Sequence, residues 1–232
     1  AYKKDKEEIE VSYKLENSEI GFALSEYDKS EDLTIDPKLV WATYYGGSHR
    51  DYAPSISIDK NNNIYVVGST HSTNFPLYNP GGDAYFQEKK ALAEFQSDPN
   101  DFTDVYIIKF NSDGVRLWAT YYGGSGDDKA TSISIDNNNN LYVVGETWSY
   151  TFPVYNPGGA YFQEKNAGKD VFIIKFNSNG MRLWATYYGG EKEDRSSSIS
   201  IDKDNNIYIV GSTRSENFPI YNSEKDAYFQ DM

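Results

Sequence analysis

The chain has 232 residues, enough to bury one sizeable core or two small ones, and its 22 basic and 35 acidic side chains give a net charge of −13. This acidic balance argues against nucleic acid and anionic membranes as partners, and the absence of cysteine excludes thiolate catalysis, disulfides and cysteine-ligated zinc. The sequence has no apolar run of the roughly 18 to 20 residues that a membrane helix needs, so we expect no membrane insertion. Its 21 tyrosines against 2 methionines favour an all-β fold, because flat rings pack well on pleated sheets.

An eight-residue segment occurs three times along the chain and marks a repeat. Its second and third copies are identical, and the first is nearly so. Each copy contains one tryptophan, and these tryptophans are 77 and 66 residues apart. A repeat of this kind decides the architecture before any single element does. The copies occupy residues 40–47, 117–124 and 183–190.

In chain order, the first element of the array is residues 40–45, which we predict to form an outer strand. The first repeat is longer than the second mainly because residues 88–103 replace residues 164–169. We predict that this insert is a surface loop.

The second repeat shows four strand-like runs separated by turn residues, the pattern of all-β repeat proteins. Its first run alternates between serine and isoleucine, whereas its third is almost continuously apolar, as expected of a strand covered on both faces. Asn and Gly in residues 137–140 and 177–180 suit tight hairpins, and we expect the first of these turns to be exposed. The runs are residues 132–136, 141–145, 170–176 and 182–188. The side chains that we predict to be buried are Ile133, Ile135, Val143, Ile173 and Trp184.

Four antiparallel strands of this kind make one blade of a β-propeller, so the predicted fold is an all-β propeller of four-stranded antiparallel blades with about three repeats present. The third repeat shows only its first two strands, residues 198–202 and 207–211, before the chain reaches Met232. Propellers close with 4 to 8 blades. We therefore expect the natural polypeptide to continue with a strand like residues 170–176, or, as an alternative, a homo-oligomer to complete the ring.

The repeated sequence Trp-Ala-Thr-Tyr-Tyr-Gly-Gly, followed by Ser-Ile-Asp, Tyr-Val-Val-Gly, Phe-Pro, Ala-Tyr-Phe-Gln and Asp-Val-Phe-Ile-Ile-Lys-Phe, resembles the bacterial "seven-bladed β-propeller" (SBBP-type) repeat. The resemblance covers residues 33–230. Residues 8–37 resemble the β-rich segment that leads into such arrays, so we divide the chain into a lead-in segment, 1–37, and propeller repeats, 38–232. The resemblance implies an exported or cell-surface protein, that is, an extracytoplasmic location, and supplies no catalytic residue.

Three Asx-rich turns imitate the oxygen spacing of calcium loops. They lack the glycine at the sixth position and the glutamate at the twelfth, and Asx residues are common in hairpin turns. We therefore favour a turn role and expect no cofactor, with calcium as the alternative. The turn residues are Asp59, Asn61, Asn63, Asp136, Asn138, Asn140, Asp202, Asp204 and Asn206.

Two sets of residues recur in every repeat, which favours structural roles over ligand binding. Asp51, Asp128 and Asp194 each follow the Gly-Gly pair by four residues, and we expect them to accept backbone N–H bonds in the turn between blades. The tryptophans of the repeated segment stand in apolar strands, and we expect them to pack between blades. The tryptophans are Trp41, Trp118 and Trp184.

The loops at residues 70–74, 147–151 and 213–217 differ between copies and are the better candidates for recognition. We predict a non-catalytic structural or interaction module that presents these loops to a protein or polysaccharide, with other blades or another polypeptide as further partners. The alternatives are a lectin-like carbohydrate-binding module and, less favoured, an enzyme whose site lies in blades outside this sequence. The candidate ligand-binding residues are His71, Trp148, Tyr150 and Arg214.

Overall fold

A computed structural model describes residues 11–16, 19–24, 40–88, 90 and 102–221. These residues form twelve strands and no helix, so the described part of the chain contains no helical span that could cross a membrane. The chain divides into two compact units, Ala1–Thr43 and Tyr44–Met232. The first unit contains an antiparallel hairpin of β1 (Val11–Glu16) and β2 (Glu19–Leu24).

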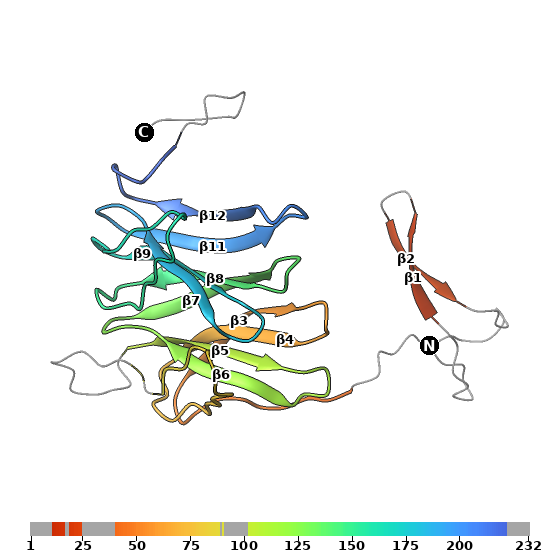
Figure 1. Cartoon of the computed structure of the whole chain (residues 1–232). Helices are drawn as coiled ribbons and strands as arrows, with labels where there is room; N and C mark the ends of the chain where they lie inside the picture. Colours follow the sequence, from red (N-terminus) through yellow and green to blue (C-terminus); the bar gives the residue numbers. More distant parts are fainter. Residues whose placement is uncertain (1–10, 17–18, 25–39, 89, 91–101, 222–232) are drawn as a thin grey trace. The chain divides into compact units, whose positions relative to one another are not determined.

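The second unit consists of three antiparallel sheets (Figure 1), two with four strands and one with two. The first sheet contains β3 (Asp51–Ile58), β4 (Ile64–Thr70), β5 (Asp104–Phe110) and β6 (Arg116–Tyr122). The second contains β7 (Asp128–Ile135), β8 (Leu141–Thr147), β9 (Asp170–Phe176) and β10 (Arg182–Tyr188). The third contains β11 (Asp194–Ile201) and β12 (Ile207–Thr213). Strands follow one another in sequence order within each sheet, which confirms the four-stranded blade.

The second sheet packs between the other two. Its first strand, β7, contacts β3, β4 and β5 on one side, and β11 contacts β7, β8 and β9 on the other. Because β9 faces both neighbours, its alternate side chains enter two different cores. Phe172, Ile174 and Phe176 join the core shared with the first sheet, whereas Val171 and Ile173 join the core shared with the third. This double burial is the reason why the run is apolar without alternation.

The first strand of each sheet contains a bulge at the same place. In β7 the register shifts between Ala130 and Ser132, and the equivalent shifts lie in β3 and β11. Opposite the bulge, the second strand always has glycine. A Cβ added to Gly145 would lie 2.1 Å from the carbonyl oxygen of Lys129 and 2.4 Å from the ring of Phe172. The glycine is therefore required by the close approach of backbone and ring.

Two expectations from the sequence are wrong. Residues 40–45 form no strand, although their later copies are β6 and β10. Those copies pair with β5 and β9, and among the described residues no such strand stands beside residues 40–45. Trp184 is half-buried where Trp118 is 2% exposed, and Ile135 is half-buried too. Ile133, Val143 and Ile173 are buried as expected, whereas residues 91–101 of the predicted surface loop lie outside the described residues.

The close approach at Gly145 gives a stability prediction. Replacing Gly145 by Ala should lower the free energy of unfolding by about 1 to 3 kcal/mol, because the new methyl group must displace a backbone carbonyl and a packed ring. Urea denaturation followed by circular dichroism measures this change. The exposed control Asn138→Ala should change the free energy by less than about 0.5 kcal/mol. Equal stabilities for the two variants would contradict the packing described here.

Candidate functional site

An aspartate organises one end of each sheet, and it is buried in the second and third sheets and half-buried in the first. Asp128 is fully buried and accepts hydrogen bonds from the backbone N–H of Gly124 at 2.7 Å, from the Ser149 hydroxyl at 2.8 Å and from the Thr147 hydroxyl. It therefore joins the turn after β6 to the loop after β8. The equivalent bonds from glycine N–H groups to Asp51 and Asp194 are 2.8 and 2.7 Å long. The expected structural role of these three aspartates is confirmed.

Burial gives Asp128 an unusual titration. Removal from water raises the pKa of its carboxyl group to about 7, although the hydrogen bonds from Thr147, Gly124 and Ser149 act in the opposite direction. A raised carboxyl pKa is also found in catalytic acids. Asp128 is inaccessible to any substrate, however, and its donors all belong to the turn and loop that it connects. The shift is therefore a property of the scaffold.

The aspartate fixes the backbone of each following loop, while one side chain in that loop differs from copy to copy. His71, Trp148 and Arg214 occupy the same position, and each donates its backbone N–H to the carbonyl oxygen of the residue before the recurring aspartate, at 2.9 to 3.0 Å. The next residue in every loop is a fully buried serine whose hydroxyl accepts a bond from the turn. The three loops thus share the same backbone hydrogen bonds but present chemically different side chains at one position.

The structure places the four candidate ligand-binding residues in different surroundings. His71 helps to line an open cleft of about 580 Å³ between the first and second sheets, together with Tyr52, Lys129 and Glu146. Trp148 and Tyr150, in the loop after β8, are 46% and 75% exposed. Arg214 is exposed and lies in a network of charges between the second and third sheets.

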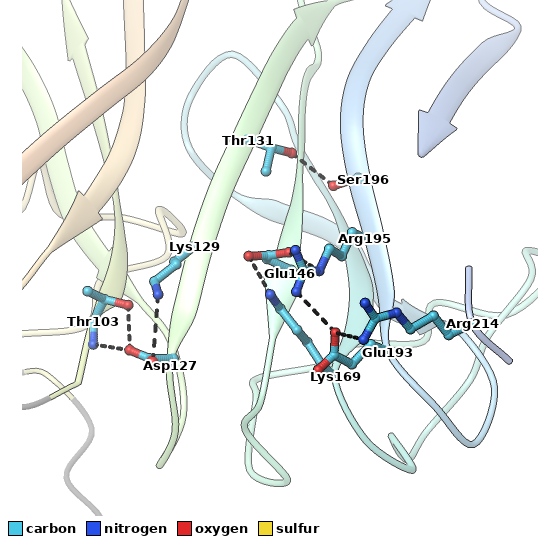
Figure 2. A network of polar contacts seen from close by, with 10 residues as sticks. All are labelled: Thr103, Asp127, Lys129, Thr131, Glu146, Lys169, Glu193, Arg195, Ser196 and Arg214. Atoms are coloured by element: carbon cyan, nitrogen blue, oxygen red, sulfur yellow. Dashed lines mark hydrogen bonds and ion pairs between the residues drawn. The ribbon is translucent and has the colours of Figure 1, made fainter. Parts of the chain in front are cut away.

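Figure 2 shows this charge network. The Lys169 ammonium group lies 2.6 Å from Glu146 Oε1, and both side chains are largely buried. Arg195 lies 3.0 Å from Glu193 Oε2 and 3.9 Å from Glu146 Oε2, and Arg214 lies 3.3 Å from Glu193. The network joins β8 and the start of β9 to β11 and the loop after β12. It holds Arg214 in a defined place, although its exposed pairs contribute little to stability.

The comparison of repeats missed most of this network. Glu146 stands where the other copies have Ser69 and Ser212, and Lys129 and Arg195 stand where the first copy has Tyr52. These positions lie on β-strands, and the sequence prediction considered only the variable loops. The signal was present in the sequence, as strand positions at which aligned repeats differ in charge.

In each of the three Asx turns, the aspartate carboxylate accepts hydrogen bonds from groups of the same turn. Asp136 Oδ1 accepts the backbone N–H of Asn138 and of Asn140 at 2.8 Å, and Oδ2 accepts the Asn140 amide at 2.8 Å and the Tyr142 hydroxyl at 3.3 Å. The turns at Asp59 and Asp202 repeat this pattern. Asn139 has a φ of 60°, as such a turn requires. This geometry supports the turn role, and calcium binding at the nine residues stays a prediction.

Comparison with known proteins matches both units of the chain. A family model described as "Beta-propeller repeat" (SBBP) matches residues 40–76, 117–153 and 183–219. A model described as "Domain of unknown function (DUF7948)" matches residues 1–38. Each SBBP match runs from the Trp-containing segment to the Phe-Pro of the variable loop. The three matches therefore contain the recurring aspartates, the Asx turns and the variable loops.

Two curated proteins are similar to the chain. The "Uncharacterized WD repeat-containing protein L264" of Acanthamoeba polyphaga mimivirus is 24% identical over 231 residues, which cover 90% of this chain and 16% of that protein. "Regulatory protein FlaEY" of Caulobacter vibrioides is 21% identical over 114 residues, which cover 49% of this chain and 12% of that protein. The chain thus spans less than a fifth of the length of either relative.

The raised pKa of Asp128 predicts a pH-dependent stability. Its folded-state pKa of about 7 exceeds the unfolded value of about 3.9, so the folded chain holds one extra proton between these limits. The stability from this proton is fully present below about pH 4 and is lost as the pH rises through 7, at up to about 1.4 kcal/mol per pH unit. Burial also raises the pKa of Asp170 to about 6, and this group contributes a decline at lower pH. Asp128→Asn should therefore show a shallower decline than the wild type in denaturant titrations from pH 4 to 8, above all between pH 6 and 7. Asn138→Ala, which changes no titrating group, should follow the wild type, and three parallel curves would refute the assignment.

Proposed function

The chain belongs to the SBBP family of β-propeller repeat proteins, and from this premise we propose that it is a non-catalytic interaction module whose inter-blade loops bind a protein or polysaccharide partner. Family membership rests on the three repeat matches and on the three stacked sheets that contain them. Repeat propellers use one scaffold to present different loops, and their blades can change on the surface without loss of the core.

One observation supports this proposal above the others. The loops after β4, β8 and β12 share their backbone hydrogen bonds, yet present His71, Trp148 and Arg214 at the same position. A position that served only the fold would keep one residue type, as Asp128 and Ser149 and their copies do. The rigid frame also lowers the entropic cost of binding, because these loops are held in place before a partner arrives.

The proposal makes the chain a binding module and not an enzyme. The names of the relatives describe WD repeats and a regulatory protein, and neither name states a reaction. We further propose an extracytoplasmic location, on a surface or in a secreted assembly, which the resemblance to exported SBBP proteins supports. One of the two relatives comes from a virus and the other from a bacterium. We also propose a bacterial source for this chain.

A lectin-like function is the second candidate, and the loop after β8 favours it. Trp148 and Tyr150 are separated by one buried serine and both expose their rings. Exposed aromatic rings beside polar groups are suited to stacking on sugar faces. This function differs from the first only in its ligand, and both require the same loop.

The experiment that tests the proposal measures binding to a panel of purified bacterial polysaccharides and surface proteins by biolayer interferometry. For a partner bound by these loops, Trp148→Ala should weaken binding by about 30-fold, the effect of removing a 2 kcal/mol hot spot. The matched control Tyr221→Ala removes an 88% exposed tyrosine outside the loops and should leave binding unchanged. Partners that bind the triple variant His71→Ala, Trp148→Ala, Arg214→Ala as tightly as the wild type would refute the assignment to the loops. Binding of polysaccharides alone would select the lectin-like function.

A further inference from the structure

An apolar groove lies between the second and third sheets. We call it the β12 groove. Its volume is about 470 Å³, and its walls come from β9, β10, β11 and β12 and from the Phe-Pro segment after β12. The apolar side chains that line it are Val171, Ile173, Trp184, Tyr188, Ile207, Ile209 and Phe218.

The repeat shows what fills such a groove. Each wall residue has an equivalent 66 residues earlier, between the first and second sheets, and every one of those equivalents is at most 3% exposed. There the space is filled by β9, whose Phe172, Ile174 and Phe176 enter the same core and are themselves completely buried. The equivalents are Val105, Ile107, Trp118, Tyr122, Leu141, Val143 and Phe152.

Three contacts of β9 define what a filling strand must provide. Phe172 stacks on Phe152 with ring centroids 4.7 Å apart, and Phe176 meets Trp118 edge-on at 5.2 Å. On the opposite face, the Lys175 ammonium group lies 4.9 Å from the centre of the Tyr142 ring. The strand β5 makes the first and third of these contacts too, with Tyr106 stacked on Phe75 at 4.4 Å and Lys109 lying 5.1 Å from the Tyr65 ring.

The residues that would receive these contacts in the third sheet are exposed or half-buried. Tyr208, the equivalent of the 3% exposed Tyr142, is 56% exposed, and Trp184 is half-buried where Trp118 is 2% exposed. Phe218 contacts Tyr188 edge-on at 5.1 Å and also lines the groove. Among the described residues β12 pairs only with β11, so its other backbone edge is open to a further strand. Open apolar edges are sites of strand addition.

We infer that the β12 groove binds an antiparallel β-strand of the sequence pattern Asp-Val-aromatic-Ile-Ile-Lys-Phe, supplied by another repeat of the same kind. The aromatic residue stacks on Phe218, the second isoleucine enters between the walls and the last phenylalanine meets Trp184. The lysine lies over Tyr208, beside the carboxylate of Asp202, which adds charge complementarity. Within this sequence the pattern occurs only as β5 and β9, which are already paired on both sides.

The strand also gains main-chain hydrogen bonds along β12. In the second sheet, β8 and β9 pair without interruption from Leu141↔Phe176 to Thr147↔Asp170. β12 has the same length as β8 and ends in the same Gly-x-Thr sequence, so it offers the same register. Main-chain bonds provide affinity for any extended peptide, whereas the groove selects the alternating large side chains. Thr213 and Phe218 flank the loop after β12, but none of His71, Trp148 and Arg214 lines the groove. Each proposal can therefore fail without the other.

The test uses the whole 232-residue chain and a fluorescein-labelled peptide with the sequence of residues 169–177. Fluorescence anisotropy should show saturable binding, and tryptophan emission should shift to shorter wavelength as Trp184 loses contact with water. A peptide with Phe172→Ser, Ile174→Ser and Phe176→Ser should bind at least tenfold more weakly, because each change removes a large apolar contact. The variant Trp184→Phe should retain most of the binding and lose the spectral shift, which places the peptide at this tryptophan.

Matched protein variants separate the groove from the loops. Phe218→Ala should weaken peptide binding by about tenfold through loss of the ring stack and its buried area, while Trp148→Ala and Ile56→Asp, on exposed surfaces elsewhere, should leave it unchanged. Circular dichroism shows that each variant is folded. Absence of saturable binding, equal affinity of the serine peptide, or unchanged affinity of a folded Phe218→Ala variant would overturn the inference. Self-association of the chain that Phe218→Ala abolishes and the peptide does not displace would show that the occupant is a second copy, which would also overturn it.

Discussion

The packing of one sheet against the next is the interaction on which the rest of this structure depends. Neither face of the second sheet meets water over most of its area, because β9 sends Phe172, Ile174 and Phe176 to one side and Val171 and Ile173 to the other. A single sheet of this composition would expose one apolar face, so each blade requires neighbours. The stability of such an array is approximately the sum of its blades and of the interfaces between them. The groove beside β12 is one of these interfaces, and among the described residues no further strand covers it.

Residues that make the contacts within and between blades recur in every repeat, whereas residues outside these contacts differ between repeats. The recurring aspartates and the glycine opposite each bulge are kept because each one meets backbone or ring atoms at a short distance. Side chains that take no part in these contacts can change without loss of the scaffold. His71, Trp148 and Arg214, which occupy the same repeat position, are examples. The same logic applies to Glu146 and Arg195, which lie on strands but form ion pairs only in the copies that contain them.

The two proposals concern chemically different surfaces. The loop face presents histidine, aromatic and arginine side chains that differ from blade to blade, which suits recognition of a specific partner. The β12 groove is apolar and its walls repeat residues found in every blade, which suits a strand that could serve any repeat of the family. The similarity to long WD repeat-containing and regulatory proteins, of which this chain matches less than a fifth, is consistent with a module that works beside other repeats.

The sequence by itself determined the repeat, the four strands of the second blade, the turn chemistry and the structural role of Asp128, because each depends on local periodicity or on spacings that recur in register. Tertiary structure decided the rest. Residues 40–45 have the sequence of β6 and β10 yet form no strand, since pairing needs a partner that local sequence does not supply. Trp184 and Trp118 stand in identical segments, but only Trp118 is covered, because β9 lies over it. The charge network and the groove likewise join residues from different blades, and their existence depends on how sheets stack and not on any one stretch of chain.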